Sequence, residues 1–430
     1  MTLTECASQF VTDSKRRAAA GMLRDRDLRR LMFAGLSGSA PAVFLSTLDL
    51  PLGVVVCNDL TGAGYMFSDL TAILGPDAVA IFPSGYKRDI KYGQPDGPQQ
   101  ILRTETLDRL HAHKSTLTWI VTYPEALAER VAAPEAMARD TLRFHPGDTV
   151  RISELLQRLL DMGFHKVDYV YEPGQFAVRG SIFDIFSYSR DMPYRFDFFD
   201  EDIDTIRTFN IETQLSEGKE DEAVILSARA SDATGGVSLL DTLDTDTVLF
   251  CADPEFVTAR VASVAAQTYS DSAVIAGEGD PDSMQKVVDP DEFRARFEAM
   301  RVAQFTPNRE AGENMAGLAR MVFDTAPQTL YHKNFDLIAD SFADFLAKGY
   351  RIMVLSDSAR QTDRLKEIFE DRGDDIVFTP VEPTLHEGFI DRGSKSCFFT
   401  DHQIFDRFHN YTLKADRCLL YTSDAADELD

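Results

Sequence analysis

The stretch Gly35-Leu36-Ser37-Gly38-Ser39-Ala40-Pro41-Ala42 has the spacing of a phosphate-binding loop but lacks the residues that bind phosphate. A functional loop reads G-x-x-x-x-G-K-[ST], in which main-chain N–H groups and the lysine contact phosphates and the hydroxyl binds Mg²⁺. Gly35 is kept, whereas Ala40, Pro41 and Ala42 replace the second glycine, the lysine and the hydroxyl residue. Proline also removes an N–H donor. The stretch predicts a degenerate P-loop-type α/β domain, with an ordinary Gly/Ser loop as the alternative.

The chain around this loop alternates between strand and helix patterns. We expect strands at 43–45, 53–57, 79–82 and 117–121. We expect helices at 65–74 and 124–131. Residues 338–400 alternate in the same way, with helices at 338–348 and 359–372 and strands at 351–356, 376–378 and 397–400. The sequence therefore predicts a further small α/β domain near the end of the chain.

Between these two regions the apolar period changes from helix-like to two. A helix is expected after Ser153 as N-cap, because Leu155, Leu156, Leu159 and Leu160 fall on one face before Gly163. Strands are expected at 167–171, 175–179, 181–187 and 194–199. One helix covering an antiparallel meander predicts an inserted small α+β domain. Period-two spacing assigns Phe183, Phe186, Phe196 and Phe198 to its core.

Composition narrows the classes of function. The chain of 430 residues has 70 acidic and 44 basic side chains, and a net charge of −26 repels phosphate backbones. Five scattered cysteines contain no C-x-x-C pair, so we expect neither zinc nor disulfides. No signal peptide or membrane span is visible, which predicts a cytoplasmic protein. We expect no catalytic or metal site; Asp291-Glu292 is interpreted as an acidic first helical turn.

A long spaced motif gives the most specific signal. It runs through Gln175-Phe176-Ala177-Val178-Arg179-Gly180, Asp184-Ile185-Phe186, Pro193-Tyr194-Arg195-Phe196-Asp197-Phe198-Phe199 and Ile203-Asp204-Thr205-Ile206-Arg207. This pattern resembles UvrB, the damage-verifying helicase of bacterial nucleotide excision repair. It is even more similar to the N-terminal part of the transcription-repair coupling factors, which carry a degenerate copy of the first domains of UvrB with the ATP site lost.

The resemblance implies that the second domain binds the excinuclease A subunit (UvrA). Arg179 matches the arginine of the shared V-R-G motif, and a guanidinium suits bidentate contact with a carboxylate. Arg195, Phe186 and Tyr188 are the candidate neighbours. The alternative for Arg179 is an ion pair with Asp184 or Glu172 within its own domain.

The resemblance also implies a division of the chain. We expect a degenerate α/β domain in two parts, 1–124 and 208–328, with the UvrA-binding domain at 125–207 and the small α/β domain at 329–417. ATP and Mg are expected only for a motor that follows in the family, together with RNA polymerase and double-stranded DNA as partners and no membrane. The alternative is a divergent UvrB-type helicase with ATPase activity. Residues 418–430 are interpreted as a non-native tail.

Overall fold

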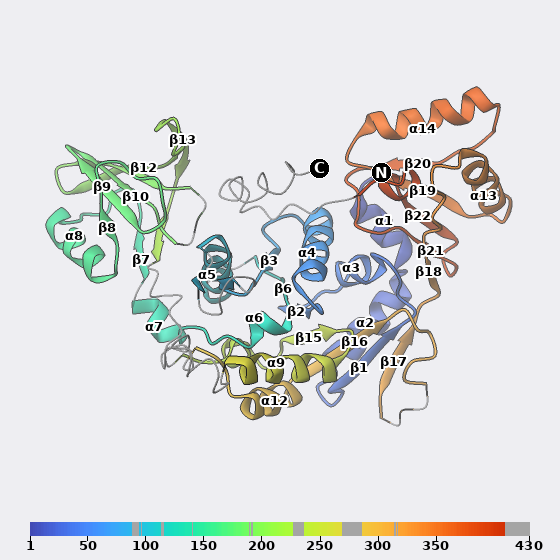
Figure 1. Ribbon diagram of the computed structural model, residues 1–430, viewed down its shortest axis with the longest axis horizontal. Coiled ribbons are helices and arrows are strands. Elements are labelled where there is room, and N and C mark those ends of the chain that lie inside the picture. Colours follow the sequence, from blue (N-terminus) through green and yellow to red (C-terminus); the bar gives the residue numbers. More distant parts are fainter. Residues whose placement is uncertain are drawn as a thin grey trace.

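The computed structural model describes most of the chain. The described residues are 1–87, 94–95, 97–112, 116–139, 141–188, 190, 192–226, 236–268, 286–313, 315 and 317–408. The predicted tail at 418–430 lies outside them. The fold is mixed α/β, with a central parallel sheet and several antiparallel sheets in distinct modules (Figure 1).

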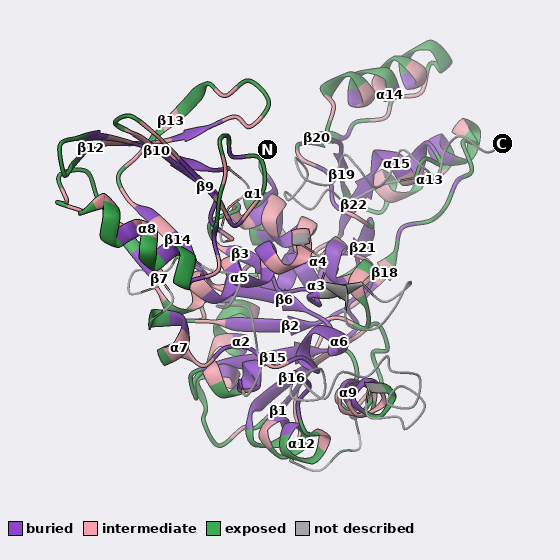
Figure 2. Ribbon diagram, turned by 60° about the vertical axis from the view of Figure 1, so that its left-hand side comes forward, coloured by how far each residue is buried: buried purple, intermediate pink, exposed green. Residues whose placement is uncertain are grey.

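A seven-stranded sheet forms the central module, and each neighbouring pair of strands in it is parallel. Its order is β17-β1-β16-β15-β2-β6-β3. The strands are β1 (Arg30–Ala34), β2 (Gly53–Val56), β3 (Val79–Ile81), β6 (Trp119–Thr122), β15 (Val248–Cys251), β16 (Arg301–Thr306) and β17 (Ala319–Val322). Figure 2 shows most of this sheet buried, as expected for parallel strands covered on both faces.

Helices cover this sheet and share one large apolar core with it. They are α1 (Leu3–Phe10), α2 (Asp13–Arg24), α3 (Ala40–Leu45), α4 (Leu60–Leu74), α5 (Gly97–His111), α6 (Pro124–Leu127), α9 (Pro254–Thr268), α12 (Pro290–Ala299) and the 3₁₀ helix η2 (Leu239–Thr242). A two-stranded ribbon joins β4 (Tyr86–Lys87) to β5 (Gln94–Pro95). Among the described helices none combines the length and apolar character needed to cross a bilayer.

Two features of this module test the sequence predictions directly. The strand predicted at 43–45 is wrong, because those residues end α3. Every residue of α3 is buried, so its apolar run has no polar face and lacks a helical period. The acidic helical turn is confirmed: Asp291 and Glu292 lie in the first turn of α12, and their N–H groups both donate to the Asp289 carboxylate at 3.0 Å.

The antiparallel module comprises residues 134–226, which lie between β6 and β15 in the chain. Its six-stranded sheet has the order β13-β12-β11-β10-β9-β8 and is antiparallel except for the parallel pair β8–β9. Strand β7 pairs separately with β14. The elements are α7 (Pro134–Arg139), β7 (Thr141–Phe144), α8 (Ile152–Asp161), β8 (His165–Lys166), β9 (Gln175–Arg179), β10 (Ile182–Ile185), β11 (Tyr194–Phe199), β12 (Asp202–Phe209), β13 (Ser216–Glu220) and β14 (Ala223–Leu226).

One face of this sheet packs against α8. Phe183, Phe196 and Phe198 are buried there with Leu155 and Leu159 of the helix, which confirms their predicted place in the core. Two local predictions are wrong. The strand expected at 167–171 is absent there and a short one lies at 165–166, and the N-cap of α8 is Arg151 instead of Ser153.

The third module spans residues 325–408 and has its own core. Its sheet has the order β18-β21-β22-β19-β20, in which β22, β19 and β20 are parallel. The elements are β18 (Thr325–Pro327), α13 (Phe335–Ala347), β19 (Arg351–Leu355), α14 (Ala359–Arg372), β20 (Thr379–Val381), β21 (Phe389–Asp391), β22 (Ser396–Thr400) and α15 (Asp401–Ile404). The strand predicted at 376–378 is displaced to β20.

Candidate functional site

The face of the antiparallel sheet opposite α8 carries a cluster of paired charges. Asp184 on β10 lies opposite Arg195 on β11, and Ile182 of the same strand lies opposite Arg179 on β9. Because side chains alternate along a strand, Arg179, Asp184 and Arg195 share this face. The sequence thus brings two arginines from separate strands to one carboxylate.

Asp184 holds both arginines. Its carboxylate is fully buried and accepts hydrogen bonds from Arg195 Nε at 2.7 Å, from Arg195 Nη2 at 2.9 Å and from Arg179 Nη2. Hydrogen bonds from Arg195 to Asp184 raise the pKa of the Arg195 guanidinium, which therefore stays charged. Arg195 also donates to the Gln214 carbonyl at 2.9 Å and lies over the Phe209 ring. Its orientation is therefore fixed on several sides.

Arg179 is the more accessible of the two arginines. Its side chain is 32% exposed, compared with 13% for Arg195. It donates to the Asp168 carbonyl at 3.0 Å and stacks on the Tyr169 ring, 4.6 Å from the centroid. The ion pair with Asp184 that the sequence offered as the alternative is therefore present, and part of the Arg179 side chain remains at the surface.

Of the two aromatic candidates, one is buried and the other is half-buried. Phe186 is fully buried and packs with Val170, Ala177 and Phe209 in a small second core. Its assignment as a partner-binding residue is corrected, because it has no surface to offer; the core packing predicted for it is confirmed. Tyr188 is half-buried, and its ring packs edge-on against Phe164, with burial raising the pKa of its hydroxyl.

The sequence interpretation missed the large exposed apolar and aromatic side chains of this module. Phe199 at the end of β11 is 80% exposed, and Tyr169, Tyr171 and Leu215 are each more than half exposed. The alternation of side chains along β11 could have predicted that Phe199 is exposed. Tyr194, Phe196 and Phe198 point into the core, so the alternate residues Arg195, Asp197 and Phe199 point outward.

The degenerate loop of residues 35–39 connects β1 to α3. Gly35 and Gly38 both have positive φ, at 82° and 58°. Ser39 precedes the first turn of α3, in which Ala40, Pro41 and Ala42 are all buried. Main chain from the third module contacts this loop: Ser39 N donates to the Glu387 carbonyl at 3.2 Å, and Glu387 N donates to Ser39 Oγ at 2.9 Å. The N–H group and the hydroxyl of Ser39 in this loop are thus both hydrogen-bonded to the main chain of Glu387.

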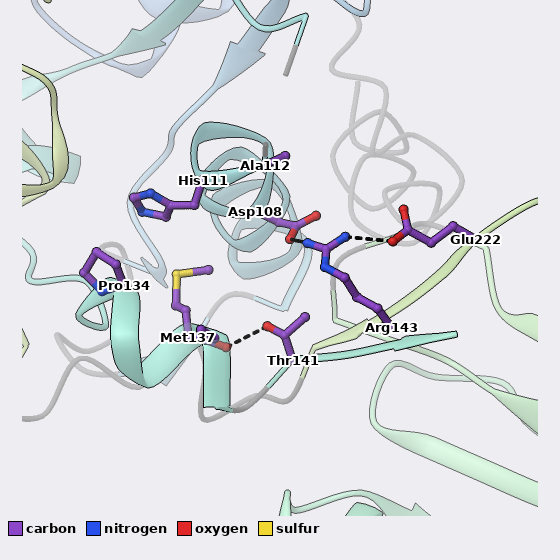
Figure 3. Close-up of a pocket in the computed structure, with 9 residues that line it drawn as sticks. Asp108, His111, Ala112, Pro134, Met137, Thr141, Arg143 and Glu222 are labelled. Atoms are coloured by element: carbon purple, nitrogen blue, oxygen red, sulfur yellow. Dashed lines mark hydrogen bonds and ion pairs between the residues drawn. The ribbon is translucent and has the colours of Figure 1, made fainter. Parts of the chain in front are cut away.

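A pocket of about 710 Å³ lies where the antiparallel module meets α5 (Figure 3). Arg143 of β7 crosses it, donating to Asp108 of α5 at 2.8 Å and to Glu222 at 3.2 Å. Burial raises the pKa of Asp108 and lowers that of His111. Within the described part of the chain no three or more His, Cys, Asp or Glu residues form a metal-binding group. At this pocket the ion pair between Arg143 and Asp108 links the antiparallel module to the central module.

Comparison with known proteins finds a family match for most of the antiparallel module. Residues 142–230 match the family described as the UvrB interaction domain. This module is therefore similar to a UvrB interaction domain. Arg179, Asp184, Arg195 and Phe199 all lie within the matched residues of the UvrB interaction domain.

Parts of the chain are similar to longer proteins. The chain is 31% identical to the transcription-repair-coupling factor of Bacillus subtilis over 196 residues, which are 44% of this chain and 16% of the relative. It is 29% identical to the Haemophilus influenzae factor over 38% of the chain and 14% of the relative. UvrABC system protein B of Streptococcus uberis is 26% identical over 41% of the chain and 28% of that protein. The matches thus span only a minor part of each relative.

Proposed function

We propose that this chain is the repair-recruiting part of a cytoplasmic transcription-repair coupling factor. Its UvrB interaction domain would bind UvrA and so link stalled transcription to nucleotide excision repair. The match of residues 142–230 carries the proposal, and similarity to coupling factors from several bacteria supports it. RNA polymerase, double-stranded DNA and an ATP-driven translocase belong, in this proposal, to the full-length parent.

The face of the sheet that carries Arg179, Asp184 and Arg195, called the arginine face below, suits such a partner. Asp184 fixes the two guanidiniums before any partner arrives, so binding would lose little side-chain entropy there. The exposed part of Arg179 would meet a partner carboxylate or carbonyl, and Phe199 would fill an apolar depression. Tyrosine and arginine are enriched among the residues that dominate binding energy, and Tyr169 and Arg179 stack on each other here.

Arg179→Ala is expected to weaken UvrA binding by about 1–3 kcal/mol, the range of a substantial interface contact. Arg195 continues to pair with Asp184 in this variant, so the domain should stay folded. Isothermal titration of the chain with purified UvrA measures the difference. Arg151→Ala is the matched control, because Arg151 lies at the N-cap of α8, away from the arginine face, and pairs with nearby Glu154. Undiminished binding by folded Arg179→Ala would remove Arg179 from the interface.

For the central module we propose a P-loop-type scaffold that no longer binds nucleotide, interrupted between β6 and β15 by the UvrB interaction domain. The absent lysine and hydroxyl support this proposal, as does the engagement of Ser39 by Glu387. The competing function is a divergent UvrB-type helicase, favoured by the similarity to UvrABC system protein B.

We expect no binding of Mg·ATP at micromolar concentration, because the loop lacks the lysine that contacts the phosphates and the hydroxyl that binds Mg²⁺. Equilibrium binding of a fluorescent ATP analogue, competed with unlabelled ATP, tests this expectation. Micromolar affinity that is lost on substitution of Ser39 would instead support the helicase.

A further inference from the structure

A short segment of the third module, His386-Glu387-Gly388, is seated on the central module. The main chain of Glu387 makes two hydrogen bonds with Ser39. The fit is close, because a Cβ on Gly38 would lie 2.8 Å from the Gly388 carbonyl oxygen. On α4 the Tyr65 ring stacks on the His386 imidazole, with centroids 3.3 Å apart and planes 12° apart. The loop and α4 together thus form a seat for this segment.

Asp69 of α4 completes the seat. It is 5% exposed, and its Oδ1 accepts a hydrogen bond from His386 N at 2.7 Å. The Ser39 hydroxyl also hydrogen-bonds to it. One carboxyl group therefore joins α4, the degenerate loop and the third module, whose residue 386 is 317 positions away in the sequence.

The surroundings of Asp69 disfavour its charged form. Burial raises the pKa of Asp69 to about 7, and the nearby Glu387 carboxylate acts in the same direction. The hydrogen bonds from Ser39 and His386 N oppose this shift without cancelling it. The His386 imidazole lies on the same segment, and imidazoles titrate near pH 6.5 in ordinary peptides. Any test must therefore distinguish titration of the His386 imidazole from titration of Asp69.

We propose that Ser39, Tyr65 and Asp69 form a proton-sensitive clasp for His386–Gly388, closed while Asp69 is protonated and weakened when Asp69 ionises. In the open state Asp69 would be hydrated, with an ordinary pKa of about 4. The closed state then binds more protons between about pH 4 and pH 7. The ratio of closed to open forms consequently falls as pH rises through that window, by up to about tenfold per unit, and levels off above it.

Hydrogen exchange of the main-chain amides of His386 and Glu387, measured in the whole chain, tests the clasp, because these two N–H groups donate to Asp69 and Ser39. After correction for intrinsic exchange rates, protection in the native protein should fall about 100-fold between pH 5 and pH 8. Asp69→Asn keeps an acceptor for His386 N but cannot ionise, so its protection should not vary with pH. Asp357→Asn is the matched control, because exposed Asp357 accepts Thr384 N at 2.9 Å within the third module. It should retain the native pH dependence.

His386→Gln separates the two titrating groups, since it keeps the main-chain N–H and removes the imidazole. The clasp predicts that this variant still loses protection as pH rises. Constant protection in the native protein, or an unchanged pH dependence in Asp69→Asn, would overturn the proposal. If Asp69→Asn does not fold, NMR titration of the native Asp69 carboxyl carbon decides: a midpoint near 7 supports the clasp, and one near 4 overturns it.

Discussion

Asp184→Ala is expected to lower the free energy of unfolding of the antiparallel module by about 3–5 kcal/mol, the cost of removing one partner from a buried ion pair. The carboxylate is fully buried and accepts three hydrogen bonds from two arginines. Without it, the largely buried Arg195 guanidinium keeps its charge but loses two of its acceptors. Denaturant unfolding followed by circular dichroism measures the loss.

Asp197→Ala is the matched control on the same face of the sheet. Asp197 is partly exposed, lies 3.6 Å from Arg207 and accepts the Thr205 hydroxyl at 2.9 Å. An ion pair of this kind contributes about 0–1 kcal/mol, so Asp197→Ala should cost clearly less than Asp184→Ala. Equal losses in the two variants would show that burial of Asp184 does not make its ion pairs decisive for folding.

The result also bears on binding. If Asp184 orients the arginines, Asp184→Asn should fold with its shape kept and still hold the guanidiniums less firmly, because an amide has one acceptor oxygen where the carboxylate has two. In the proposed function, binding of the partner would then depend on Asp184, although Asp184 is fully buried and cannot contact the partner itself. Asp184 is in this sense a positioning residue for Arg179 and Arg195.

The apolar pattern was sufficient to predict a strand where buried and more exposed residues alternate along the chain. The strand at 194–199 could be predicted in this way, because one of its faces packs in the core with α8 and the other does not. The strand at 175–179 was predicted as well, although Ala177 on its other face is buried in the second core. The same logic fails for α3, whose residues are buried on every side. It fails again at 167–171, where Val170 is buried in the second core although it lies in a loop and not in a strand.

The candidate site was only partly accessible to sequence reasoning. Arg179 and Arg195 could be selected by motif, whereas the pairing of Arg179 was offered only as an alternative to partner binding, with Asp184 or Glu172 as the carboxylate. The exposure of Phe199 could have been predicted only by extending the alternation of side chains along β11 to its last residue. The contact between Asp69 and His386 had no local signal, because it joins elements that only the tertiary fold brings together.

Gly35→Ala is expected to destabilise the protein by about 2–6 kcal/mol, which would explain why the first glycine of the loop is kept when its lysine is absent. Gly35 has φ of 82°, and a side chain in such a conformation costs about 1–3 kcal/mol. A Cβ there would also lie 2.1 Å from the Phe323 carbonyl oxygen and 2.9 Å from Arg309 Cγ. Because main chain must move to relieve this overlap, overpacking adds a further cost of about 1–3 kcal/mol.

Gly75→Ala separates the two contributions. Gly75 ends α4 with a similar φ of 87°, but no atom of the described chain lies within 4 Å of the place its Cβ would take. This variant should therefore lose only the conformational part, about 1–3 kcal/mol. Comparison of the two variants by denaturant unfolding gives the cost of the close approach between Gly35 and Phe323. A Gly35→Ala protein no less stable than Gly75→Ala would mean that this approach is not what requires glycine in the loop.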